Sequence, residues 1–199
     1  MSAAGPESTM KSATQREGHS GEAATALFTV GHSTRPIEEF VALLESHRIR
    51  RVVDVRTVPR SRRNPQYGID VLPQNLAARG IDYLHMPSLG GLRHARRDSP
   101  NMGWRNATFR GYADYMQTPE FEQALEELTA LAREKLTAMM CAEAVPWRCH
   151  RSLIADALVV RGATVKHIMS AASAQPHRMT PFARVDGKRI VYPAPEAPA

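Results

Sequence analysis

The segment 136–168 constrains the fold more than any other part of the chain. Its first apolar run ends at Cys141, a polar loop follows, and a helical pattern over 152–161 leads to a second apolar run at 165–168. This order predicts a strand, a loop, a helix and another strand, which is the repeating unit of a parallel sheet. Ligands of such sheets bind outside the carboxyl ends of the strands. We therefore expect the loop after Cys141 to hold the reactive groups.

The same alternation of apolar runs and helical patterns extends over the rest of the chain. Short apolar runs predict strands at 27–30, 52–55 and 81–86, and amphipathic helical spacing lies between them. The stretch 89–111 is rich in Gly and Arg and is interpreted as a long loop. The chain is therefore predicted to form one α/β domain, with a mainly parallel sheet, helices on both faces and a site at the carboxyl ends of the strands.

Capping and turn residues mark the ends of several predicted elements. Thr34 is expected to cap the first helix, and Gly80 to close the second. Thr118 is expected to open a long amphipathic helix. The pair Asp186-Gly187 favours a short hairpin near the end of the chain.

The two ends of the chain have compositions typical of disorder. Residues 1–25 are small and polar without periodicity, and residues 193–199 consist of Pro, Ala and Glu. We therefore predict a disordered tail at each end and one domain over 26–192. With 199 residues in all, the chain can bury a core of ordinary size.

Composition also bounds the compartment and the ligand. The chain has two cysteines, too few for a disulfide framework, no run near the roughly 20 apolar residues of a membrane helix, and no secretory signal. We therefore expect a cytoplasmic protein without a membrane partner. The net charge of +6 favours an anionic ligand, from a phosphate ester to a nucleotide or nucleic acid. A basic chain can also serve solubility alone.

Polar side chains follow four of the predicted strands at the point where each strand ends. They are His32 and Ser33, Asp54 and Arg56, His85, and Cys141 with Glu143. Because the carboxyl ends of parallel strands share one edge, we expect these side chains to meet there.

Four motifs occur in order along the chain. They begin TVGHSTRPIEEF at residue 29, LGG at 89, FRGY at 109 and MCAEAVPWRCHRSLIADAL at 140. Together they resemble the domain-of-unknown-function 488 family over roughly residues 27–170. The resemblance implies an α/β fold but no particular activity. It also implies that the family's signature positions are Gly31, His32, Ser33, Asp54, Arg56, Glu143, Cys149, His150 and Arg151.

A weaker resemblance is to the rhodanese-like sulfurtransferases. They also place Asp-Val-Arg after an early strand, as at 54–56 here, and a strand-ending cysteine before an Arg-Ser pair that opens a helix. Here Cys141 and Arg151-Ser152 have that order, but nine residues separate Cys141 from Arg151. This loop is longer than that of rhodaneses, so a tight ring of backbone amides around the cysteine is not expected.

Cys149 is the first candidate for chemistry. It precedes a predicted helix and is flanked by Arg148, His150 and Arg151, and both a helix N-terminus and nearby cations stabilise a thiolate. It could therefore be a nucleophile or a ligand, or it could pack as a small apolar residue. Cys141 ends an apolar run and is expected to be buried. The spacing of the two cysteines does not determine whether they can form a disulfide.

Glu143 and a possible metal site leave further alternatives open. Glu143 could act as a general acid or base, or could form an ion pair with Arg148 or Arg151. Cys141, Cys149 and His150 are possible metal ligands. Because adjacent Cys and His are unlike the spaced pairs of zinc sites, no metal or other cofactor is assigned.

An arginine-rich loop follows the second predicted strand. Arg56, Arg60 and Arg62 could bind phosphate, because guanidinium groups bind phosphate in a bidentate manner. Tyr67 and Trp104 could stack on a base. The alternative is a solvated basic loop.

The leading hypothesis is an enzyme that acts on a phosphate-bearing substrate. Its anion site would consist of Arg56, Arg60, Arg62 and Arg151 with Gly31, His32 and Ser33. Cys149 would be the nucleophile or a ligand, and Glu143, His150 and Asp54 would be the other catalytic residues. Two alternatives stay open: a nucleic-acid-binding module without catalysis, and a thiol-redox or sulfur-transfer protein. The oligomeric state is not determined by the sequence.

Overall fold

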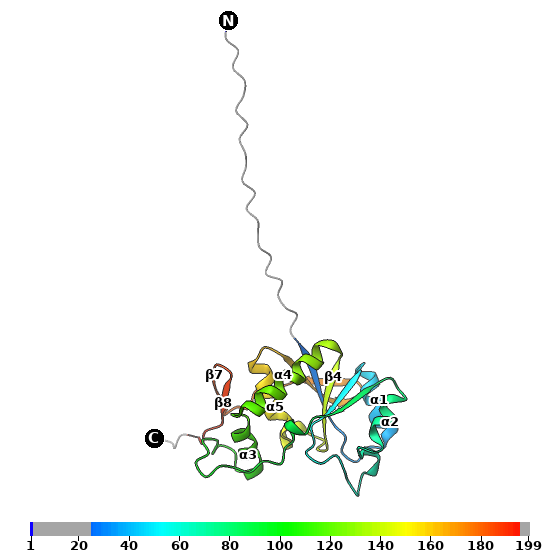
Figure 1. Ribbon diagram of the computed structural model, residues 1–199, viewed down its shortest axis with the longest axis horizontal. Coiled ribbons are helices and arrows are strands. Elements are labelled where there is room, and N and C mark those ends of the chain that lie inside the picture. The colour runs from blue at the N-terminus through cyan, green and yellow to red at the C-terminus, as the bar shows by residue number, and fades with distance from the viewer. Residues whose placement is uncertain (2–24, 196–199) are drawn as a thin grey trace.

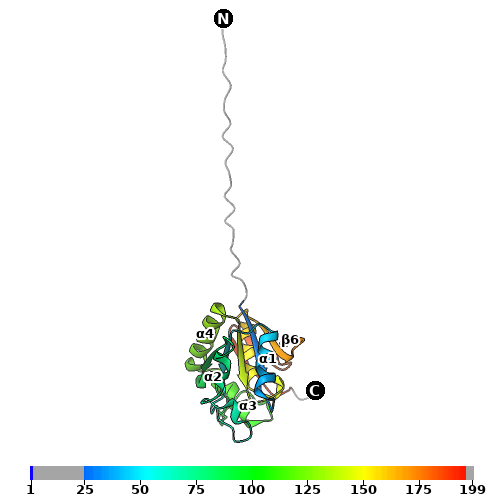
Figure 2. The same ribbon diagram turned by 90° about the vertical axis from the view of Figure 1, so that its right-hand side faces the viewer.

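In the computed structural model, which describes residues 1 and 25–195, a six-stranded sheet carries helices on both faces (Figure 1). The strand order is β3-β2-β4-β1-β5-β6. The strands are β1 (Ala26–Gly31), β2 (Arg51–Asp54), β3 (Asp82–His85), β4 (Thr137–Cys141), β5 (Thr164–Ser170) and β6 (Ser173–Pro176). All pairs within β1–β5 are parallel, whereas β6 pairs antiparallel with β5 at one edge (Figure 2). The predicted mainly parallel sheet is confirmed. Most of the two predicted tails lies outside the described residues.

The helices cover the sheet in two groups. They are α1 (Ile37–Ser46), α2 (Leu72–Ala77), α3 (Ala107–Tyr115), α4 (Pro119–Glu134) and α5 (Arg151–Val160). Side chains of β4 alternate between the two groups: Ala138 and Met140 pack with α1 and α2, whereas Met139 packs with α3, α4 and α5. Because both faces of β2 and β4 are covered, these strands are buried throughout, which explains the adjacent apolar residues at the centre of each.

Two of the expectations at element ends are wrong. Thr34 does not cap α1, because the residue before that helix is Pro36 and no side chain caps it. The predicted loop 89–111 is too long, because α3 begins at Ala107, where Asn106 accepts a hydrogen bond from the Thr108 amide at 2.8 Å. The cap on α4 is confirmed, since Thr118 Oγ1 accepts from the Phe121 amide.

Other turn predictions are confirmed, and one strand was not predicted. Gly80 follows α2 with a positive φ of 66°. A hairpin of β7 (Arg184–Asp186) and β8 (Arg189–Val191) turns at Gly187, whose φ is also positive. Strand β6 has the sequence SAQP, which contains no apolar alternation, and it forms because the free edge of β5 is available for pairing.

Backbone hydrogen bonds beyond the strands bring the carboxyl ends of four strands to one edge. The His32 amide donates to Cys141 O at 3.0 Å, and the Val55 amide donates to Met140 O at the same distance. The Met86 amide donates to Asp54 O at 2.9 Å. The residues that follow β1, β2 and β4 are therefore fixed side by side. None of the helices in the described ranges is long and apolar enough to cross a membrane.

Candidate functional site

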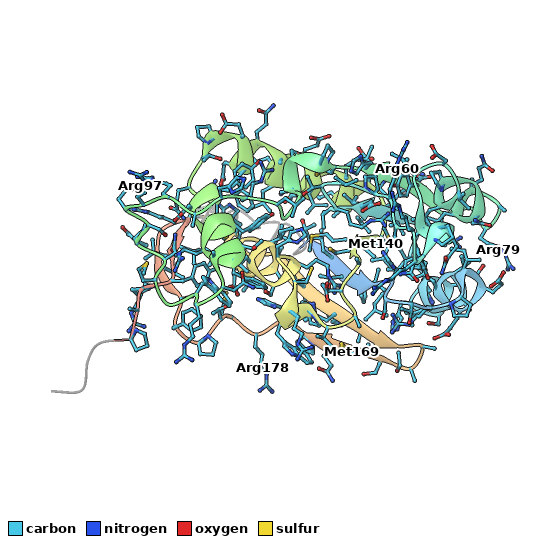
Figure 3. The ribbon with its side chains drawn as sticks, turned by 90° about the horizontal axis from the view of Figure 1, so that it is seen from below. Arg60, Arg79, Arg97, Met140, Met169 and Arg178 are labelled. Atoms are coloured by element: carbon cyan, nitrogen blue, oxygen red, sulfur yellow. The ribbon has the colours of Figure 1, made fainter. Side chains whose placement is uncertain are left out.

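A cavity of about 550 Å³ lies at this edge of the sheet. Figure 3 shows the molecule from the side to which β1 and β4 point, with Arg60 and Met140 labelled. The predicted site residues that line the cavity are His32, Ser33, Arg56, Arg60, Cys141, Glu143 and His150. The other predicted site residues, Gly31, Asp54, Arg62, Cys149 and Arg151, do not line this cavity.

The side chain of Arg151 holds the loop 142–149 in place through hydrogen bonds. Its side chain is buried, and its Nη2 donates to Glu143 O at 2.6 Å, while its Nη1 donates to Thr29 Oγ1 at 3.3 Å. Its Nε donates to Cys149 Sγ at 3.4 Å. One guanidinium group therefore joins β1, the start of the loop and the cysteine at its end. Gly31 permits this close packing, because a Cβ there would lie 1.8 Å from Glu143 O.

The two cysteines and His150 form a compact cluster. Cys141 and Cys149 are both buried, and their sulfurs and a ring nitrogen of His150 all lie within 4.8 Å of one another. The sulfur of Cys141 lies within 4.8 Å of that of Cys149, and His150 Nδ1 lies 3.7 Å from Cys149 Sγ. The expectation that Cys141 is buried is confirmed. The structure also gives the separation of the two thiols, which their spacing in the sequence left open.

The environment separates the pKa values of the two thiols. Burial raises the pKa of Cys149, but hydrogen bonds from Cys141 and His150 and the positive charge of Arg151 outweigh it, so the pKa lies well below the ordinary value. The pKa of Cys141 is raised by its hydrogen bond to Cys149 and by burial. Of the two thiols, Cys149 is therefore the one whose ionised form the surroundings favour.

His150 is oriented by a backbone carbonyl. Its Nε2 lies 3.0 Å from Val55 O, so Nε2 carries the proton that this bond needs. The Nδ1 atom consequently faces Cys149 and can take its proton. Cysteine nucleophiles are activated by this arrangement, in which a base lies beside the thiol and a third group orients the base.

Asp54 and Arg56 form a buried ion pair beside the cavity. Arg56 Nε donates to Asp54 Oδ1 at 2.8 Å, and Arg56 Nη2 also donates to Tyr67 O at 2.7 Å. Tyr83 donates its hydroxyl proton to Asp54 Oδ2. Most donors of Arg56 are therefore occupied by the protein itself, and Asp54 is fully buried.

His32 is held neutral between these groups. Its Nδ1 donates to Ser33 O at 2.8 Å and its Nε2 accepts from Arg56 Nη1 at 3.3 Å. The ring stacks on Tyr67 with centroids 4.0 Å apart. Burial, together with the charge of Arg56, lowers its pKa to about 4. His32 is therefore an uncharged wall of the cavity at neutral pH.

Two charged side chains on the cavity wall are accessible. Arg60 is exposed and lies 3.7 Å from the exposed Asp70, a pairing that is worth little in water. Glu143 is exposed, and its carboxylate makes no ion pair with Arg148 or Arg151. Its backbone carbonyl binds Arg151 instead. Of the two alternatives for Glu143, the ion pair is therefore wrong, and the carboxylate is available to a ligand.

Sequence reasoning missed a row of buried polar side chains that are hydrogen-bonded to one another and begin at Thr29, a partner of Arg151. His167 Nδ1 lies 2.7 Å from Thr29 Oγ1, His167 Nε2 lies 2.9 Å from His177 Nδ1, and His177 Nε2 lies 2.7 Å from Asp156 Oδ1. Burial lowers the pKa of His167 to about 4. The signal that could have found it is Asp156, a carboxylate in the otherwise apolar helical stretch LIADALVV.

The cysteine cluster could also hold a metal ion. Two thiolates and an imidazole are ligands that zinc prefers, and a tetrahedral zinc ion separates a sulfur from a nitrogen ligand by about 3.6 Å. The 3.7 Å between Cys149 Sγ and His150 Nδ1 fits that value. The bond from His150 to Val55 O would fix the ring, as is usual for ligating histidines. Within 25–195 no further His, Cys, Asp or Glu joins this cluster.

Comparison with known proteins shows that the chain is similar to one protein family. A family model described as Domain of unknown function DUF488 matches residues 36–158, which include β2 to β4 and most of the cysteine cluster's helix. No curated protein and no solved structure matches the chain.

Proposed function

The chain belongs to the DUF488 family, and we propose that this member is a thiol-dependent enzyme in which Cys141 and Cys149 cycle between a dithiol and a disulfide. One observation supports the proposal above all. The sulfur of Cys149 lies between a guanidinium N–H and an imidazole nitrogen, next to a second thiol. Cations and a base beside one thiol make a thiolate, and a second thiol within reach can complete an exchange reaction.

The first step would occur at Cys141, because this thiol lines the cavity. Its sulfur attacks one sulfur of a small disulfide while its proton passes to the Cys149 thiolate. The sulfur–sulfur bond of the substrate breaks, and one half leaves as a thiolate that takes a proton from water. The product is a mixed disulfide between Cys141 and the other half of the substrate.

The second step would release that half. Cys149 transfers its proton to His150 and attacks the Cys141 sulfur, and the bond to the substrate breaks. The remaining thiolate leaves and is protonated. The substrate has gained two electrons and two protons, and the protein holds a Cys141–Cys149 disulfide that a second thiol compound reduces.

The cavity wall favours a polar substrate with a negative charge. Arg60, Ser61 and Asn64 line the cavity together with Cys141. Because Arg60 has only a weak exposed partner, it can pair with a carboxylate or phosphate of the substrate. This retains the anionic ligand expected from the sequence and assigns its recognition to Arg60 rather than to Arg56.

The experiment that tests the function is trapping with oxidised glutathione, a disulfide that carries carboxylates, read by peptide mass spectrometry in the presence of a chelator. The reduced protein should yield a Cys141–Cys149 disulfide. Cys149→Ser should stop at glutathione on Cys141, and Cys141→Ser should take up far less. If the wild type forms no internal disulfide and both thiols stay inert to alkylation over the whole pH range, the proposal is wrong.

A second candidate is a metal-assisted reaction at the same cluster. The specific observation in its favour is that Cys141, Cys149 and His150 offer two sulfurs and one nitrogen within 4.8 Å. Zinc sites with three protein ligands keep a fourth position for water or substrate, and Cys141 and His150 face the cavity. Elemental analysis of the purified protein separates the candidates. One equivalent of zinc, lost in Cys141→Ser and in Cys149→Ser, would favour the metal.

A further inference from the structure

A second cavity, of about 640 Å³, lies on the other side of the loop 142–149. Its lining includes Trp104, Trp147, His167, His177, Arg178 and Phe182. We infer that this cavity binds a planar aromatic ring bearing a negatively charged group, the chemistry of a mononucleotide. The inference is independent of the thiol chemistry proposed above, because it uses none of the cysteines. Cavities of this volume are in the range of small-molecule sites.

Aromatic side chains form the walls. Trp104 packs against Phe182 with ring centroids 5.0 Å apart, and the two imidazoles of His167 and His177 meet edge to face at 5.1 Å. Trp147 is 63% exposed, which is unusual for so large an apolar side chain. Flat rings on several sides bind flat ligands by stacking, and nucleobases stack on aromatic side chains in this way.

Trp104 also offers an unused donor. In the described part of the chain, its indole Nε1 is the only buried side-chain nitrogen or oxygen without a hydrogen-bond partner. Such groups are rare in folded proteins and call for an explanation.

Arg178 supplies the positive charge. Its side chain is exposed on the cavity wall, and it points away from the body of the protein in Figure 3. The structure gives it no ion pair or hydrogen bond within 25–195. Asp156, the buried carboxylate that contacts the neighbouring His177, is also bonded to Thr180 and Tyr192. Arg178 is therefore available to a phosphate group.

Intrinsic fluorescence tests the inference directly, because the chain has two tryptophans and both line this cavity. Adenosine 5′-monophosphate is the probe, with adenosine and inorganic phosphate as comparisons. The nucleotide should cause a saturable change in fluorescence, adenosine should bind more weakly, and phosphate alone should cause none. In Trp147→Phe the change should persist through Trp104.

Matched variants then identify the contacts. Arg178→Gln should weaken binding of the nucleotide about 10-fold to 100-fold and leave adenosine unaffected, as expected for loss of a charge-assisted bond. Arg97→Gln, which removes another exposed arginine outside the cavity, should change neither. The inference is overturned if no compound gives a saturable change, if phosphate competes as well as the nucleotide, or if the two arginine variants behave alike.

Discussion

The imidazole of His150 lies so close to Gly91 that a Cβ on Gly91 would come 2.4 Å from its Nδ1. This contact and the hydrogen bond to Val55 O hold the ring from two sides. The loop after β3 therefore determines which ring atom faces Cys149. The geometry of the thiol site depends on a residue that carries no side chain of its own.

Gly91→Ala should displace this ring. Because the hydrogen bond and charge of His150 help to lower the pKa of Cys149, the variant should move that pKa up, toward the ordinary thiol value of about 8.5. The measurement is the rate of Cys149 alkylation against pH in the presence of chelator. Leu92→Ala, an exposed neighbour in the same loop, is the control and should leave the curve in place. An unchanged curve in Gly91→Ala would show that His150 does not act on Cys149.

Arg151→Lys should impair both the loop and the thiolate. A lysine carries its donors at one point, so it cannot bond Thr29, Glu143 O and Cys149 at once. We expect a loss of about 3–5 kcal/mol in the free energy of unfolding, as for other broken buried charge networks, together with a higher pKa of Cys149. Urea unfolding and the alkylation curve measure the two effects. Arg148→Lys, at an exposed position, should change neither, and a wild-type curve in Arg151→Lys would contradict the role of the guanidinium.

Asp54→Asn separates stability from chemistry. Asp54 holds the buried guanidinium of Arg56 and accepts from Tyr83, but it does not line the cavity. Removing its charge should lower the free energy of unfolding by about 3–5 kcal/mol, because Arg56 is left uncompensated. The alkylation of Cys149 in the folded variant should follow the wild-type pH curve. A shifted curve would instead support the catalytic role that its position at the end of β2 predicted.

The fold could be predicted where hydrophobic periodicity is strong. The apolar runs that became β2 and β4 are buried on both faces, so their sequences leave little choice but a central strand. Strand β6 and the start of α3 could not be predicted in this way. The first depends on the free edge of β5, and the second on a single capping residue, Asn106.

For the candidate site, the sequence could predict only which loop holds it, and not how its side chains pair. Parallel strands bring their carboxyl ends together, which is why Cys141 and His32 meet. The partners of Arg56 could not be predicted, since an arginine near a rim can point to a ligand or to a buried carboxylate. Nor could the pairing of Thr29 with His167, because these residues are 138 positions apart and only the pairing of β1 with β5 brings them into contact.

The two buried histidines predict how stability depends on pH. The pKa values of His32 and His167 are lowered from 6.5 to about 4, chiefly by burial. Between these values the unfolded chain binds more protons than the folded one, so the free energy of unfolding falls as the pH falls. Each contribution is complete above pH 6.5 and lost by about pH 4, and it amounts to at most about 3 kcal/mol per histidine at about 1.4 kcal/mol per pKa unit. Urea unfolding from neutral pH to pH 4 should show this slope, and His167→Gln should flatten it relative to the wild type. Equal slopes in the two proteins would mean that folding does not lower the pKa of His167.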